Sequence, residues 1–95
     1  MKIGDRVLVR TYSAGVHFGT LTLQDGKHVV LSDARRIWYW TGAFTLSKIA
    51  LDGVGKDSKI SCAVPEITLT EAIEIIPLSD TANKNLTEFP EHDIK

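Results

Sequence analysis

Alternation of side-chain character in the N-terminal part of the chain is the strongest constraint on its fold. From about residue 5 to about residue 12, two sets of side chains alternate, Val7, Val9 and Thr11 against Leu8, Arg10 and Tyr12. This is the two-residue period of a β-strand. A second alternating run covers about residues 16–23, and Ser13-Ala14-Gly15 between the two runs supplies small residues for a turn. The sequence therefore predicts antiparallel strands joined by tight turns.

Two more strands and a helix are predicted in the middle of the chain. Asp25-Gly26 is a strong hairpin signal, because both residues tolerate a positive φ. Val29–Leu31 is the third predicted strand and residues 34–40 the fourth, with a short break at Ser32-Asp33. Residues 45–53 then change to helical spacing, with a threonine at the start as N-cap and a glycine at the end.

The C-terminal part is predicted to hold one long strand and one more helix. The strand has apolar residues at odd positions, Ile67, Leu69, Ile73 and Ile75, and a bulge is expected near Thr70-Glu71. Pro77 ends this strand and Ser79 opens the helix, whose apolar stripe is Ala82, Leu86 and Phe89. The resulting prediction is an α+β fold, a small antiparallel β-sheet of about five strands with two short helices. Residues 1–89 are expected to form a single domain and residues 90–95 a flexible tail.

Length and composition restrict the classes of protein that fit. A chain of 95 residues makes one domain with a modest core, which an oligomer would extend. The net charge of −1 argues against a protein that coats long nucleic acid. The single cysteine, Cys62, excludes an intrachain disulfide, and the chain reads as intracellular. We expect no signal peptide and no membrane association, because no apolar run approaches the roughly 20 residues of a membrane span.

The segment from Asp33 to Trp40 combines two arginines with three large aromatic residues. Guanidinium groups bind phosphates and aromatic rings stack on bases, so the segment suits a flat, negatively charged ligand. Strand alternation predicts one face with Arg36, Trp38 and Trp40, and an opposite face with Arg35, Ile37 and Tyr39. The alternative is structural: the tryptophans fill the core or a dimer contact, and the arginines make surface ion pairs with Asp33 or Glu74.

A second candidate site lies in the first predicted hairpin. Arg10, Tyr12, Ser13 and His17 surround its small-residue turn, where backbone amides can approach an anion closely. A hairpin turn with incidental polar residues explains the same pattern. Proximity of this turn to the arginine and tryptophan segment in the folded chain would support the interpretation as a binding site.

Catalytic and metal-binding motifs are not found in the sequence. His17, His28 and His92 lack metal-ligand spacing, so we expect neither a metal nor a cofactor. Cys62 has no evident base partner and is expected to be a buried structural thiol. With no nucleophile elbow, phosphate-binding loop or zinc-protease motif, the sequence predicts a protein that is not an enzyme.

Three segments together resemble a family of small bacteriophage-encoded proteins long described only as a domain of unknown function: VRTYSAGVHFGTL, GKHVVLSDARRIWYWTGAFTLSKIA and VPEITLTEAIEIIP. The resemblance extends over nearly all of residues 6–78 and is most specific from Leu31 to Ala43. It implies an anti-defence role in the host cytoplasm, similar to that of the anti-CBASS sponges. Such proteins hold a cyclic dinucleotide such as cyclic GMP–AMP without cleaving it.

A sponge of this kind would be a homo-oligomer, a dimer or a tetramer, with arginines and aromatics repeated across a symmetric interface. The expected ligand-binding residues are Arg10, Tyr12, Ser13, His17, Arg35, Arg36, Trp38 and Trp40. Two other functions remain open. The aromatic strand would serve equally as the protein–protein interface of a phage structural or host-interaction protein, and a single-stranded nucleic-acid binder is disfavoured only by the net charge.

Overall fold

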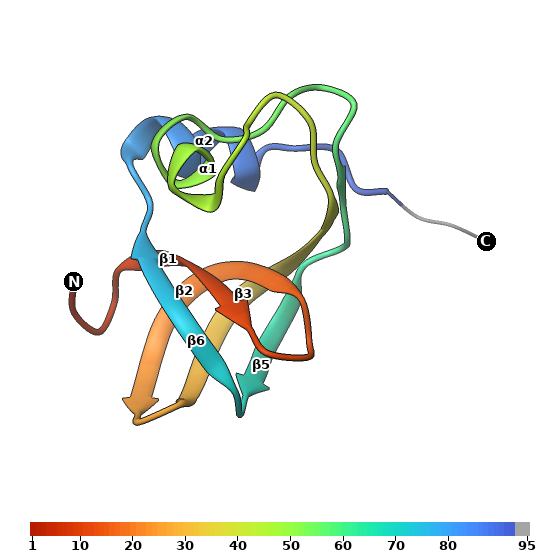
Figure 1. Ribbon diagram of the computed structural model, residues 1–95. Coiled ribbons are helices and arrows are strands. Elements are labelled where there is room, and N and C mark those ends of the chain that lie inside the picture. The colour runs from red at the N-terminus through yellow and green to blue at the C-terminus, as the bar shows by residue number, and fades with distance from the viewer. Residues whose placement is uncertain (93–95) are drawn as a thin grey trace.

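The computed structural model describes residues 1–92 as a curled sheet with two helices on one side (Figure 1). In chain order the elements are β1 (Arg6–Thr11), β2 (Val16–Asp25), β3 (His28–Tyr39), α1 (Leu46–Asp52), β4 (Lys59–Ile60), β5 (Val64–Leu69), β6 (Ala72–Pro77) and α2 (Asp80–Thr87). A small antiparallel sheet with two short helices is confirmed. The sheet has six strands, one more than expected. The sequence does not predict β4, because a strand of two residues is too short to show alternation.

The strands form one strongly curled sheet that stays open between β5 and β6. Its order is β4-β3-β2-β1-β6, and β5 pairs with β3 on the same side as β4. All of these pairs are antiparallel. Only Thr70 and Glu71 separate β5 from β6, yet β5 pairs with β3 and β6 pairs with β1. The sheet must therefore curl so that β5 and β6 approach each other at this connection, and the curl encloses an apolar interior.

Alternating positions of each strand supply two separate cores. The core inside the curl contains Val7, Val9, Leu21, Val29, Leu31, Ala34, Leu69 and Ala72. The core between sheet and helices contains Leu8, Val16, Phe18, Ile37, Ile49, Ala50, Val54, Ile60 and Leu86. Because both faces of β1 and β3 are covered, apolar residues occupy consecutive positions there. At roughly 25 cal/mol per Å² of buried apolar surface, both cores contribute substantially to stability.

The expected break at Ser32-Asp33 is wrong, because β3 runs through it as one long strand. Asp33 has a φ of +49°, and the pairing of β3 with β2 shifts register at this point. This is a β-bulge, which interrupts alternation without ending the strand. Gly19 on β2 faces the bulge, where a Cβ would lie 3.0 Å from the carbonyl oxygen of Ser32. Glycine therefore permits the close approach of the two strands.

Two other strand predictions also need correction. The single strand expected over residues 67–75 is two strands, and Thr70-Glu71 is a turn between them instead of a bulge. Leu69 and Ala72, on either side of that turn, both face the inner core. The apolar pattern therefore continues across the turn and does not reveal that the chain changes direction there. The hairpin at Asp25-Gly26 is confirmed with its centre one residue later, because Asp25 pairs with His28.

Both helices begin where the sequence predicts. The Thr45 side chain accepts a hydrogen bond from the backbone N–H of Lys48, and that of Ser79 accepts one from Ala82. Gly53 ends α1 with a φ of +82°. Phe89 lies past the end of α2, where it packs against the core between sheet and helices.

Residues 90–92, the described part of the tail predicted to be flexible, lie against β4. Glu91 forms a parallel bridge with Ile60, and the His92 backbone N–H donates to the Ile60 carbonyl at 2.8 Å. Residues 93–95 lie outside the described residues. The segment that follows α2 thus crosses back over β4, and we call residues 88–92 the C-terminal strap.

Candidate functional site

The C-terminal half of β3 carries the arginine and aromatic segment, and alternation gives its side chains different environments. Arg36 and Trp38 project into solvent, and Trp38 is 60% exposed. Arg35 and Ile37 point toward the helices and are buried. An exposed tryptophan forgoes the burial of a large ring, which is normally worth a few kcal/mol. Its position is therefore informative about function.

The short strand β4 and the residue after it place a cation and an anchoring hydroxyl beside Trp38. Lys59 pairs with Tyr39, and its Nζ lies 5.1 Å from the ring centroid of Trp38 and 5.8 Å from that of Tyr39. Both are cation–π distances. Ser61 fixes the backbone of Arg36 twice: its N–H donates to the Arg36 carbonyl at 2.9 Å, and its Oγ accepts from the Arg36 N–H at 3.0 Å.

The C-terminal strap brings a second ring to Trp38. Its bridge with Ile60 places the imidazole of His92 over Trp38, with ring centroids 6.1 Å apart and an angle of 9° between the planes. The tryptophan therefore already holds a flat ring in a parallel orientation.

These residues surround a surface pocket of about 250 Å³, which we call the Trp38 patch: Arg36, Trp38, Lys59, Ile60, Ser61 and His92. None of the described residues that line it is acidic. The patch presents two permanent cations, a broad π-face and a hydroxyl. This chemistry suits an aromatic ring that carries phosphate.

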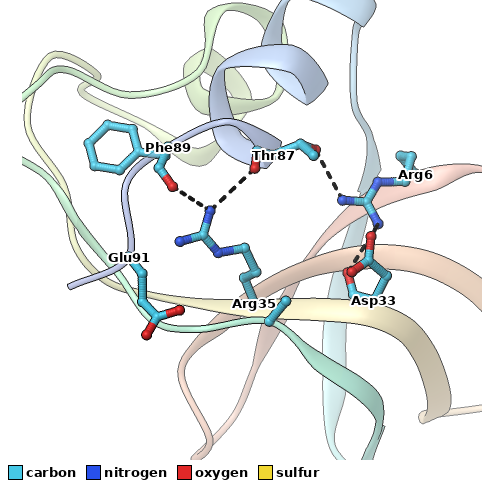
Figure 2. A pocket seen from close by; sticks show the side chains of 7 residues that line it. Arg6, Asp33, Arg35, Thr87, Phe89 and Glu91 are labelled. Atoms are coloured by element: carbon cyan, nitrogen blue, oxygen red, sulfur yellow. Dashed lines mark hydrogen bonds and ion pairs between the residues drawn. The ribbon is translucent and has the colours of Figure 1, made fainter. Parts of the chain in front are cut away.

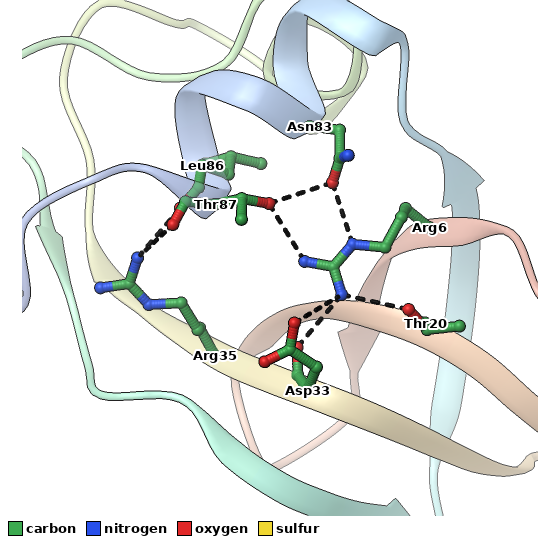
Figure 3. A network of polar contacts seen from close by, with 7 residues as sticks. All are labelled: Arg6, Thr20, Asp33, Arg35, Asn83, Leu86 and Thr87. Atoms are coloured by element: carbon green, nitrogen blue, oxygen red, sulfur yellow. Dashed lines mark hydrogen bonds and ion pairs between the residues drawn. The ribbon is translucent and has the colours of Figure 1, made fainter.

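Arg35, which is expected to bind ligand, donates hydrogen bonds at the end of α2 (Figure 3). Its Nη1 donates to the carbonyl oxygens of Leu86 at 3.0 Å and Phe89 at 2.7 Å, and its Nε donates to that of Ser61 at 2.7 Å. The last carbonyls of a helix have no partners within the helix, so a buried guanidinium satisfies them. Burial lowers the pKa of Arg35 below the usual arginine value, and nearby acidic groups, led by Glu91, oppose the shift.

Arg6, which the sequence analysis did not single out, is the other arginine that joins sheet and helix. It donates to Asn83 Oδ1 at 2.9 Å, to Thr87 Oγ1 and Thr20 Oγ1 at 3.2 Å, and to the Asp33 carbonyl at 3.1 Å (Figure 3). Burial lowers the pKa of Arg6, and the Asp33 carboxylate, 3.8 Å away, opposes that shift. The predicted partner of Asp33 was an arginine of β3, and the structure shows Arg6 instead.

A pocket of about 240 Å³ separates Arg6 from Arg35 (Figure 2). Two carboxylates, those of Asp33 and Glu91, also line it. The charges of the two guanidinium groups are thus balanced locally, and most of their N–H groups already have acceptors. This pocket therefore offers less to an anion than the Trp38 patch does.

His17 is buried inside the curl of the sheet. It pairs with Arg36 on β3 and Val9 on β1, it is 1% exposed, and its Nε2 lies 2.9 Å from the Ala14 carbonyl. Burial is the main cause that lowers its pKa; the bond to Ala14 opposes the shift, and the Arg36 charge adds to it.

The structure does not bring the remaining turn residues to the Trp38 patch. The Ser13 hydroxyl donates to Glu71 Oε1 at 2.7 Å, and the Tyr12 backbone N–H donates to the Glu71 carbonyl at 3.0 Å. The turn thus docks on the β5–β6 connection. Arg10 is exposed on β1, between β2 and β6.

Of the eight predicted site residues, Arg36 and Trp38 lie together in the Trp38 patch. Trp40 follows the end of β3 and packs against the core, as the structural alternative anticipated. Lys59, Ser61 and His92 complete the patch and were not predicted, because only tertiary contacts bring segments so distant in sequence to β3.

Comparison with known proteins gives a family and a fold. A family model described as a domain of unknown function, DUF6948, matches residues 4–86. The chain belongs to this family. No curated protein gives a significant match. Among solved structures, the chain is similar to a heptameric archaeal Sm protein studied for its implications for the eukaryotic snRNP core, with a TM-score of 0.54 and 20% identity over 81% of this chain and 90% of that chain. At this identity the likeness is one of fold.

Three further findings concern residues 1–92. No helix there is long and apolar enough to cross a membrane. In the same part of the chain, no three histidine, cysteine or acidic side chains gather closely enough to hold a metal ion. Cys62, expected to be buried, is exposed.

Proposed function

We propose that this protein binds a cyclic dinucleotide immune signal, such as cyclic GMP–AMP, at the Trp38 patch and sequesters it uncleaved, as a phage anti-defence protein in the host cytoplasm. The observation that supports binding is an exposed tryptophan with a lysine 5.1 Å from its ring and an arginine two residues before it. The resemblance of the sequence to phage sponge proteins supplies the ligand class.

The chemistry of the patch matches the parts of such a ligand. A base stacks on the Trp38 ring, which is worth about 1–3 kcal/mol per base. Arg36 and Lys59 bind phosphate oxygens through charge-assisted hydrogen bonds. Sequestration needs only these contacts, since no bond of the ligand is broken.

A homo-oligomer is part of the proposal, because two strand edges are free. Within the described residues, β5 pairs only with β3 and β6 only with β1, so each has an outer edge without a partner. Val64 on β5 and Ile73 on β6 are exposed. Pairing the β6 edge of one copy with the β5 edge of the next would use two different surfaces, and such contacts can close into rings. The similar Sm protein is heptameric.

Isothermal titration of the protein with cyclic GMP–AMP tests the proposal directly, with the linear dinucleotide as the control ligand. We expect saturable binding of the cyclic form at micromolar protein and recovery of intact ligand after heat denaturation of the complex. Absence of saturable binding would refute the proposal. Recovery of a cleaved product would show an enzyme instead.

A protein–protein interface is the second candidate function, favoured by the exposure of other aromatic residues. Phe44, in the loop before α1, is 98% exposed, and Tyr39 is 51% exposed. Arg36→Ala separates the two functions when nucleotide affinity and oligomer mass are both measured, with Arg10→Ala as the matched strand arginine outside the patch. Loss of nucleotide binding at unchanged mass supports the sponge. Dissociation into monomers supports the interface.

A further inference from the structure

A second, smaller cavity adjoins the Trp38 patch, between β3 and β5. It has a volume of about 180 Å³ and is lined in part by His17, Arg36, Cys62, Val64 and Ile67. Sites that enclose whole drug-sized ligands usually measure roughly 300–1,000 Å³. This cavity, which we call the His17 pocket, is therefore suited to one ring system of a larger ligand.

Among the polar residues that line the His17 pocket, which also include Arg35, Arg36 and Ser61, the histidine has a fixed tautomer. Nε2 lies 2.9 Å from the Ala14 carbonyl oxygen, which can only accept, so Nε2 carries the proton and donates. In the neutral ring Nδ1 is then an acceptor. No buried side-chain nitrogen or oxygen in residues 1–92 lacks a partner, and no bond to Nδ1 is found among them. Nδ1 therefore keeps a small accessible area, although His17 as a whole is only 1% exposed, and His17 is one of the residues that line the pocket.

The environment keeps this acceptor available. Burial and the nearby Arg36 charge both lower the pKa of His17, so the ring remains neutral at physiological pH. The surrounding walls include Ala34, Val64 and Ile67, which are apolar. A hydrogen-bond acceptor among apolar walls selects for a flat ring whose edge donates an N–H group.

The two pockets are adjacent because Arg36 and Ser61 line both of them. Arg36 thus lies between a π-face on one side and an edge-reading histidine on the other. A ligand with two rings joined through phosphate would place its charge at Arg36 and one ring in each pocket.

We propose that the His17 pocket receives the second base of the bound nucleotide edge-on, with His17 Nδ1 accepting a hydrogen bond from an N–H group of that base. The inference rests on the proposed function, which supplies the nucleotide, and it adds a specificity-determining residue. Trp38 binds one base by its face, without regard to its identity. His17 reads the edge of the other.

The single cysteine provides the first test, because Cys62 is exposed and lines the His17 pocket. The rate of its alkylation by iodoacetamide is measured in the wild-type protein with saturating cyclic GMP–AMP, and with inorganic phosphate as a control that can occupy Arg36 alone. We expect the dinucleotide to slow alkylation at least tenfold and phosphate to leave the rate unchanged. Calorimetric binding of the dinucleotide at an unchanged alkylation rate would refute the second-base site while leaving the proposed function intact.

Nitrogen-15 NMR of the His17 ring provides the second test and needs no variant. Acceptance of a hydrogen bond should move the Nδ1 resonance upfield on addition of cyclic GMP–AMP and leave the protonated Nε2 resonance in place. His17→Phe keeps a ring of similar size without nitrogen, and it should weaken binding at least fivefold if the variant remains folded. An unmoved Nδ1 resonance in the bound protein overturns the assignment, whereas absence of any dinucleotide binding to the wild type overturns the proposed function as well.

Discussion

Trp38 is the residue on which the proposed function depends most. Its ring is largely exposed and takes no part in either core, so Trp38→Ala should leave the midpoint of thermal unfolding nearly unchanged. Loss of one stacked base should weaken cyclic GMP–AMP binding by about 5- to 150-fold. Isothermal titration measures this change, and Trp38→Phe, which keeps a π-face, should retain most of the affinity. Equal affinity of the alanine variant and the wild type would place the ligand elsewhere.

His17 should make stability depend on pH. Its pKa is lowered in the folded chain and is about 6.5 in the unfolded chain, so the unfolded state binds more protons at acid pH. Titration of His17 leaves the free energy of unfolding unchanged above about pH 6.5. Below that pH it lowers the free energy of unfolding by at most about 1.4 kcal/mol per pH unit. Urea unfolding at several pH values should show a shallower acid decline for His17→Gln. Parallel profiles for the two proteins would contradict this.

At the scale of the elements, Arg35 joins β3 to α2 and to the C-terminal strap. Arg35→Met keeps a long apolar stem but leaves the carbonyls of Leu86, Phe89 and Ser61 without their charged donor. We expect a loss of about 3 kcal/mol in the free energy of unfolding, measured by urea denaturation. Arg10→Met, an exposed arginine on β1, should change it by less than about 0.5 kcal/mol.

The same variant should also loosen the strap. Hydrogen exchange of the His92 amide, which donates to Ile60, should accelerate in Arg35→Met and stay unchanged in Arg10→Met. Unchanged exchange in both variants would show that the bridge at Glu91 holds the strap without Arg35.

Elements governed by local chemistry were predicted from the sequence, whereas those that depend on long-range pairing were not. Thr45 and Ser79 cap their helices as expected, because a cap needs only its own next residues. The sequence predicts a strand end at Ser32-Asp33 where the structure has a bulge, since alternation alone does not separate a bulge from a break. β4 was missed because two residues carry no period, and its pairing with β3 creates half of the candidate site.

For the whole molecule, the free edges of the sheet predict assembly. Ile73→Lys places a charge on the exposed edge of β6 and should shift the protein from oligomer to monomer in light scattering, with little change in thermal stability. Leu51→Lys on α1, where the leucine is 61% exposed, is the matched control and should keep the oligomer. A wild-type protein that is monomeric at high concentration would refute the assembly.

The sequence by itself determined the class of fold, the start of each helix and the chemistry of the Arg36–Trp38 segment, since each follows from periodicity or from neighbours along the chain. Only the tertiary structure decided which arginine faces solvent and which supports α2. Arg35 and Arg36 are neighbours in the sequence, so no rule based on local sequence distinguishes them. They differ only in what packs against each face of β3. The same packing brought Lys59 and His92 to Trp38.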